Sequence, residues 1–166
     1  MQAGQYAIAI GSNRRHGRHG APRAVIGAAA EALADTGLIV RGVSPVMTSP
    51  AMGPGGRSYA NAAALIETPL DPPALLELLK SIERAFGRRR GRRWGARVLD
   101  LDIALWSGGQ WRSDGLRVPH SGLPHRDFVL RPLLALVPAW KTGTSHGTVR
   151  HALARLKTRS RRPKVS

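Results

Sequence analysis

The sequence of 166 residues has no cysteine, few aromatic residues, and only ten Asp and Glu against 26 Lys and Arg. Because cysteine is absent, disulfide bonds and thiolate metal sites are excluded. Long hydrophobic runs are also missing. The longest early run, residues 6–10, is too short for a signal-peptide core or a membrane span. We therefore expect a cytoplasmic protein that does not enter a membrane.

The shortage of acidic residues leaves a formal net charge of +16. Such an excess attracts polyanions, which include nucleic acids, anionic membranes and nucleotide phosphates. The excess is nearly all arginine and is concentrated in residues 14–23, 84–97 and 150–164. Composition alone favours nucleic acid, so only the motifs can separate that partner from a nucleotide.

The chain length suits a single domain with one core. Apolar residues make up 42% of the sequence, which is not the composition of a disordered chain. Neither an internal repeat nor a domain linker is visible. We expect one domain over residues 1–157 and a basic, disordered tail over residues 158–166.

Hydrophobic periodicity and turn residues predict the order of the elements. Strands are expected at residues 5–10, 38–46, 58–67 and 98–106. Helices are expected at residues 21–36, between Asp71 and Gly87, and at residues 126–136 and 148–157. Residues 48–56 and 119–125 are expected to be loops, and residues 107–112 a hairpin turn. This order predicts an α+β sandwich of the ferredoxin-like kind, with a mainly antiparallel sheet flanked by helices.

Asp100 and Asp102 lie two residues apart on a predicted strand. Successive strand side chains point to opposite faces, so the two carboxylates share one face, roughly 7 Å apart. Leu99, Leu101 and Ile103 then share the other, buried face. Two like charges side by side need a cation, and Mg²⁺ prefers such oxygen ligands. Two ions would suit a phosphoryl transfer. The alternative is a solvated strand face whose carboxylates pair with arginines.

Six of the ten residues at 88–97 are arginine, and they lead directly into the aspartate strand. Arginine matches phosphate oxygens bidentately, so a nucleotide phosphate is one expected ligand. Arg97 lies nearest in sequence to the carboxylates. The alternative is a nucleic-acid contact loop, which Trp94 would also suit. The known glycine-rich phosphate motifs are absent, so an ATP site would be built from side chains.

Residues 93–103 (RWGARVLDLDI) closely resemble the signature of the 6-hydroxymethyl-7,8-dihydropterin pyrophosphokinase family. Further matches follow in the family's order over residues 5–140. They are AIGSN at 9–13, TSPAMG at 48–53, YANAA at 59–63, IE at 82–83 with GR at 87–88, VPH at 118–120, Arg126, FVL at 128–130 and PL at 132–133.

The resemblance implies that the domain transfers pyrophosphate from ATP to the pterin hydroxymethyl group and releases AMP, in folate biosynthesis. It implies a ferredoxin-like fold and a monomer. Asp100 and Asp102 would be catalytic and would hold two Mg²⁺ ions. Arg88 and Arg97 would also be catalytic, contacting the ATP phosphates and the migrating group.

The remaining roles are likewise implied by matched positions alone. On the ATP side these are Arg126, His120 at a phosphate oxygen, Glu83 in the nucleotide pocket, and Trp94 in a closing loop. On the pterin side, Asn61 would bind the ring edge, Tyr59 and Phe128 would sandwich the ring, Thr48 would lie in a closing loop, and Asp100 would also contact the substrate.

Several departures from the family pattern stand out. Ala104 replaces a larger aliphatic residue. The basic loop is one residue short, so assignments at residues 88–92 shift accordingly. Residues 121–125 (SGLPH) lack the usual polar and basic run, which puts a second nucleotide contact in doubt.

Two further functions stay open from the residues themselves. One is a basic nucleic-acid-binding domain of ferredoxin-like fold, although the chain has no aromatic-rich strand of the kind that an RNA-recognition module needs. The other is an inactive scaffold. The resemblance implies no obligatory nucleic-acid partner.

Overall fold

The computed structural model describes residues 2–49, 57, 59–87, 98–143 and 147–161. Its elements follow one another in the order β1 (Gly4–Ser12), α1 (Pro22–Asp35), β2 (Ile39–Val43), β3 (Met47–Ser49), β4 (Tyr59–Thr68), α2 (Pro72–Ala85), β5 (Asp100–Trp106), β6 (Trp111–Ser113), β7 (Leu116–Val118), a short 3-10 turn η1 (Leu123–His125), α3 (Asp127–Leu136) and α4 (Val149–Ser160).

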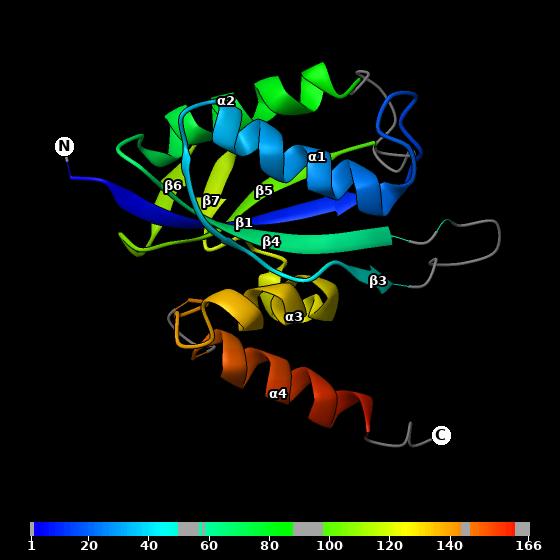
Figure 1. Cartoon of the computed structure of the whole chain (residues 1–166). Coiled ribbons are helices and arrows are strands. Elements are labelled where there is room, and N and C mark those ends of the chain that lie inside the picture. Colours follow the sequence, from blue (N-terminus) through cyan, green and yellow to red (C-terminus); the bar gives the residue numbers. More distant parts are fainter. Residues whose placement is uncertain (1, 50–56, 58, 88–97, 144–146, 162–166) are drawn as a thin grey trace.

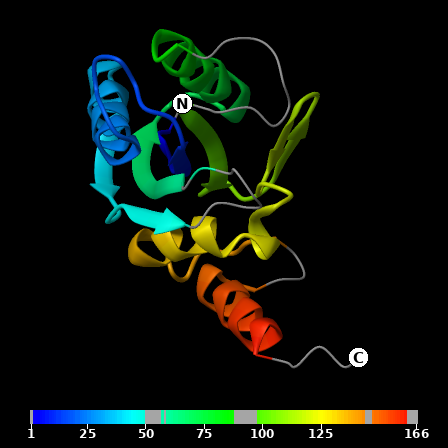
Figure 2. The same ribbon diagram turned by 90° about the vertical axis from the view of Figure 1, so that its right-hand side faces the viewer.

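The main sheet has the strand order β2-β4-β1-β5, with β3 also paired to β4, and every pairing is antiparallel. Helices α1 and α2 cover one face of this sheet, α3 covers the other, and α4 lies outside α3 (Figure 1). In the view turned by 90°, the β6–β7 hairpin lies on the β5 side of the sheet (Figure 2). This arrangement confirms the predicted ferredoxin-like α+β fold.

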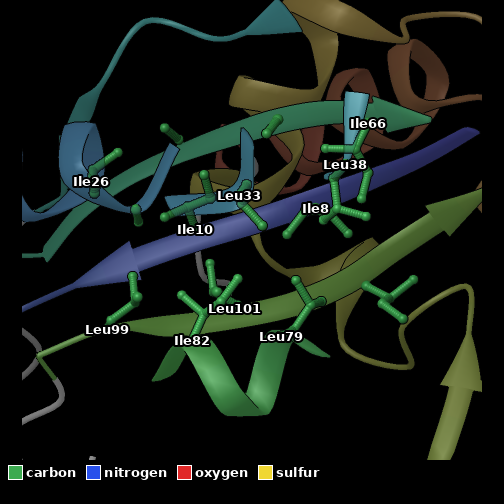
Figure 3. Packing of buried hydrophobic residues seen from close by; sticks show 14 of the residues in the cluster. Ile8, Ile10, Ile26, Leu33, Leu38, Ile66, Leu79, Ile82, Leu99 and Leu101 are labelled. Atoms are coloured by element: carbon green, nitrogen blue, oxygen red, sulfur yellow. The ribbon is translucent and has the colours of Figure 1, made fainter. Parts of the chain in front are cut away.

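The larger core fills the space between the sheet and the helices α1 and α2. Alternate residues of the central strands point into it, among them Ile8 and Ile10 of β1 and Leu101 of β5 (Figure 3). Leu33 of α1 and Leu79 of α2 meet them from the helical layer. The period of two along the strands thus decides which side chains are buried here.

A smaller core lies on the opposite face, under α3. The sheet contributes small side chains there, such as Ala7, Ala63 and Ala104, and α3 contributes Leu130 and Leu133. Because the alanines are short, α3 can pack close to the strands. Helix α4 is attached to this core by buried residues of its own, Val149, Ala152 and Leu153.

The start of α2 confirms its predicted cap. The Asp71 carboxylate accepts a hydrogen bond of 2.9 Å from the backbone N–H of Ala74, which satisfies one of the free donors of the first turn. Leu75, Leu79 and Ile82 form the buried stripe of this helix, at helical spacing. The stripe fixes which side of α2 faces the sheet, and Glu83 follows it directly.

Two predicted boundaries are wrong. Thr48 and Ser49 were expected in a loop, but with Met47 they form β3, because the segment pairs with residues 59–61 of β4. The tail was expected to be disordered from residue 158, but α4 continues to Ser160. Residues 50–56 of the predicted loop and residues 162–166 lie outside the described residues.

The predicted turn after β5 is found at the expected position, but the strand that follows it does not pair with β5. A hydrogen bond of 3.0 Å from the Gly109 N–H to the Trp106 carbonyl closes it. The strand that follows, β6, pairs with β7 and not with β5.

Among the described residues, none of the helices combines the length and hydrophobicity that a membrane span requires.

Candidate active site

One row of paired residues crosses the sheet and assembles the predicted polar residues. Gly11 of β1 is paired with Asn61 of β4 on one side and with Asp100 of β5 on the other. Paired residues of antiparallel strands place their side chains on the same face. Asn61 and Asp100 therefore share one face although 39 residues separate them in the chain, and Asp102 shares it by alternation.

The floor between these side chains is built from very small residues. Gly11 separates Asn61 from Asp100, and the next row consists of Ala63, Ala9 and Asp102. A Cβ added at Gly11 would lie 3.5 Å from the Asn61 Oδ1 atom. These two rows therefore set no bulky side chain between an amide at one side and two carboxylates at the other.

The two carboxylates lie close enough for their charges to repel each other, as is expected at a cation site. Burial, and then the charge of Asp100, raise the pKa of Asp102, while His120 and Lys80 lower it. Both aspartates are half-buried. Two nearby carboxylates suit a hard divalent cation such as Mg²⁺, which takes oxygen ligands and keeps several waters. The described residues contain no group of three or more His, Asp or Glu able to hold a metal. Water and substrate oxygens would complete the coordination.

Glu83 stabilises the strand that carries the aspartates. Its side chain is fully buried, and its carboxylate accepts a hydrogen bond of 2.8 Å from the backbone N–H of Leu101, the residue between Asp100 and Asp102. Lys80 lies 3.7 Å from the same carboxylate. Because β5 ends the sheet order, this N–H would otherwise lack a strand partner. This contact gives Glu83 a positioning role, and the nucleotide-pocket role implied for it stays a prediction.

His120 and Arg126 are held together by a tight turn. The Gly122 backbone N–H donates to His120 Nδ1 at 3.2 Å, and the His120 N–H donates to the Ala104 carbonyl at 3.1 Å. A neutral His120 therefore carries its ring proton on Nε2, where it can donate to an anion. A Cβ at Gly122 would meet Arg126 Nε at 3.0 Å, so the glycine gives the Arg126 side chain room to cross the turn.

A hollow of about 330 Å³ adjoins His120, between the β6–β7 hairpin and residues 142–143. Arg112 and Arg117 also line it, and they are directly paired across the hairpin. Like charges directly opposite each other destabilise a strand pair, so an anion in the hollow would relieve them. Neither arginine was singled out from the sequence. The signal available was the pair of arginines flanking the Asp114–Gly115 turn.

The residues expected to hold a flat ring lie in different elements. Tyr59 begins β4 and is half-buried on the same strand face as Asn61, because the two residues are two apart. Phe128 lies in the first turn of α3 and is 37% exposed, which is unusual for so large an apolar side chain. In the part of the chain that the structure describes, no ring contact joins the two.

Thr48 is placed apart from this group. It pairs with Ala60, whose side chain is in the larger core, so Thr48 belongs to the face opposite Asn61, and it is exposed. The structure thus brings together Asn61, Asp100 and Asp102, and separately His120 and Arg126. Arg88, Trp94 and Arg97 lie outside the described residues.

The hydrogen bond from Leu101 to Glu83 predicts a difference between two substitutions. Glu83→Ala leaves a buried N–H without an acceptor and should lower the free energy of unfolding by about 1–3 kcal/mol. Glu83→Gln keeps an oxygen acceptor and should cost less. Urea denaturation of both variants measures this. Equal losses would mean that the charge of Glu83, and not its hydrogen bond, supports β5.

The raised pKa of Asp102 predicts a pH dependence of stability without metal. The folded state holds the Asp102 proton more tightly than the unfolded state, whose pKa is the ordinary 3.8. Ionisation therefore destabilises the fold as the pH rises above that value. In a chelating buffer, Asp102→Asn should be more stable than the wild type at pH 7, and the gain should shrink towards pH 4. Asp114→Asn, on an exposed turn, is the control. A gain independent of pH would contradict the assignment.

Comparison with known proteins identifies the family of the chain. A family model for 7,8-dihydro-6-hydroxymethylpterin-pyrophosphokinase (HPPK) matches residues 7–138. The chain is 46% identical over 98 residues to the 2-amino-4-hydroxy-6-hydroxymethyldihydropteridine pyrophosphokinase of Methylorubrum extorquens, covering 59% of this chain and 61% of that protein. It is 40% identical over 135 residues to the protein of that name from Pseudomonas aeruginosa, covering 79% of each.

A match with the Synechocystis protein of the same name covers 63% of its length, so the chain spans less than two thirds of two of these relatives. Among solved structures, the wild-type HPPK-DHPS of Plasmodium falciparum aligns with a TM-score of 0.72 and 13% identity, over 95% of this chain and 42% of that one. This likeness supports the fold. Because the family model covers most of the sequence, the chain belongs to the 7,8-dihydro-6-hydroxymethylpterin-pyrophosphokinase family.

Proposed function

We propose that the protein transfers pyrophosphate from ATP to 6-hydroxymethyl-7,8-dihydropterin and releases AMP, a step of folate biosynthesis. The observation that carries the proposal is the row of Asn61, Gly11 and Asp100 across the sheet, in a chain of this family. The row sets an amide and a carboxylate on either side of a floor without bulky side chains. A flat heteroaromatic ring with polar edges fits such a surface.

The pterin is proposed to lie over this floor. Asn61 carries both a carbonyl acceptor and an amide donor, which suit the alternating donors and acceptors of a pterin edge. Tyr59 and Phe128 would stack on the two faces of the ring, an arrangement that also explains why Phe128 is exposed. The hydroxymethyl group would then point towards Asp100 and Asp102. Thr48 lies on the opposite face of the sheet and is not part of this arrangement.

The triphosphate is proposed to lie between the aspartates and the turn that holds His120. His120 would donate its Nε2 proton to a phosphate oxygen, and Arg126 would add a positive charge beside it. Arg117 and Arg112 extend the positive surface along the adjoining hollow. From the family resemblance, Arg88, Trp94 and Arg97 would close over the nucleotide. Transfer of this kind rests mainly on positioning and charge neutralisation.

Asp100 and Asp102 are the residues that would hold Mg²⁺, and two ions are proposed. When bound, the metal supplies charge neutralisation for the triphosphate. The pterin hydroxyl oxygen attacks the β-phosphorus and gives up its proton to water, the bond from that phosphorus to the α,β-bridging oxygen breaks, and AMP leaves. Glu83 keeps the backbone between the two aspartates in place during this step. We also propose that the enzyme is monomeric and cytoplasmic.

The product of the reaction is the direct test. With ATP, Mg²⁺ and the dihydropterin, AMP should appear in step with a pterin diphosphate. Asp102→Ala should reduce turnover by about 100-fold or more, because a metal-holding carboxylate contributes several kcal/mol to the barrier. Asp114→Ala is the control and should keep full activity. Formation of ADP would indicate a single-phosphoryl kinase, and unchanged turnover of Asp102→Ala would exclude the metal assignment.

The stacking of Tyr59 and Phe128 on the two faces of the pterin ring, which we call the ring clamp, is tested by measuring pterin binding. Phe128→Ala should weaken the affinity for the pterin by about tenfold, because a stacked ring contributes roughly 1 kcal/mol beyond its buried area. The affinity for ATP should stay within about twofold of the wild-type value. Ile39→Ala removes another exposed apolar side chain, on the far edge of the sheet, and should change neither. Equal pterin affinities for wild type and Phe128→Ala, by calorimetry, would place the clamp elsewhere.

A further inference from the structure

The C-terminal part of the chain carries positive charge that the proposed reaction does not use. The family model ends at residue 138, and α4 lies beyond it. After Asp127 the sequence contains nine Lys and Arg and no Asp or Glu. More than half of the net charge of +16 therefore comes from the last quarter of the chain.

The apolar side of α4 is already occupied. Val149, Ala152 and Leu153 are buried, and Leu156 packs against the same small core beside α3. The helix therefore presents only polar and small side chains to the solvent, on the outermost layer of the molecule (Figure 1). A helix that binds a membrane in its plane needs a free apolar face, and α4 has none to offer.

Three cations form a row along the exposed side of α4. Arg150, Lys157 and Arg161 are spaced by seven and four residues, so they lie within about 40° of one another and about 10 and 6 Å apart along the axis. All three are exposed. Within the described part of the chain, their side chains make no hydrogen bond or ion pair.

Neighbouring cations of this row repel one another. Like charges four residues apart, such as Lys157 and Arg161, destabilise a helix. The acidic residue nearest in sequence, Asp127 of α3, is engaged at 3.1 Å by Arg131 of its own helix. An anion spread along the row would remove the repulsion, and a single small anion would reach only part of it.

We propose that the exposed row of α4 binds the phosphate backbone of a nucleic acid, as a second activity separate from pyrophosphate transfer. Regularly spaced phosphates match a row of cations, and arginine binds phosphate oxygens bidentately. An acidic protein is a poorer fit, because protein interfaces depend on buried aromatic or large apolar anchors. The exposed side chains of α4 include neither kind. Contact with the backbone alone makes the binding independent of base sequence.

The test compares two triple variants of the full chain that lose the same charge. The first is Arg150→Gln, Lys157→Gln and Arg161→Gln. The matched control is Arg23→Gln, Arg41→Gln and Arg131→Gln, whose arginines are already engaged by Val46, Glu67 and Asp127. Fluorescence anisotropy of a labelled single-stranded RNA of mixed sequence gives Kd at several salt concentrations, and duplex DNA of equal length is titrated alongside.

The α4 variant should bind RNA or DNA at least about tenfold more weakly than the wild type at low salt. For RNA, the slope of log Kd against log salt should fall by about 2, since each phosphate contact on a single strand contributes about 0.7. The RNA affinity of the control should stay within about twofold of the wild-type value. Pyrophosphate transfer should be unchanged in both variants, and both should stay folded, although the control loses two surface ion pairs and should melt slightly earlier. Equal weakening in both variants, or in neither, overturns the proposal. Poly-glutamate or phosphatidylserine vesicles that bind as tightly as RNA, with the same loss in the α4 variant, overturn it in favour of a protein or a membrane.

Discussion

Strand β1 is hydrogen-bonded on both sides, to β4 and to β5, and the positions of Asn61, Asp100 and Asp102 follow from these two registers. A slip of one residue in either pairing would move Asn61 or the aspartates to the opposite face. The β5 register is interrupted once, between Ala7 and Ile8, which leaves Ala104 as an extra residue on β5. The carbonyl of Ala104 then accepts the N–H of His120. The irregularity thus joins the aspartate strand to the segment that carries the histidine.

The same registers explain why small residues matter as much as charged ones. Gly11 and Ala9 stand between β4 and β5 on the face that carries Asn61 and the aspartates. A larger side chain at either position would fill the floor on which we place the substrate. Ala63 and Ala104 have a related effect beside this floor, where they let α3 approach the sheet. The site is therefore as much a region without bulky side chains as a cluster of functional groups.

Local patterns in the sequence predicted the parts of the structure that depend on local rules. Alternation placed Asp100 and Asp102 on one face and buried Leu101, and Asp71 was recognised as a helix cap. Strand β3 and the β6–β7 hairpin were not predicted, because three-residue strands are too short to show periodicity and form only through their pairing. Arg112 and Arg117 went unnoticed for the same reason.

Glu83 shows how far the sequence alone can predict the role of a single residue. At the end of an apolar helix stripe it looks like a solvated flank, and by family resemblance like a nucleotide contact. Its partner is a backbone N–H 18 residues away, on a strand whose position the helix pattern does not encode. The roles at Arg88, Trp94 and Arg97, and those of the pterin clamp, remain predictions.

The two outer strands of the sheet also bear on how the chain avoids joining its own copies. An outer strand offers unpaired N–H and C=O groups, which can recruit a strand from another molecule. On β2 the extra residue Arg41 interrupts the register and is held by Glu67 at 2.9 Å, beside the exposed Ile39 and Val43. On β5 the N–H of Leu101 is already taken by Glu83. The carboxylate that holds the strand of the two aspartates thus also occupies an edge N–H that a strand of another molecule would otherwise bind.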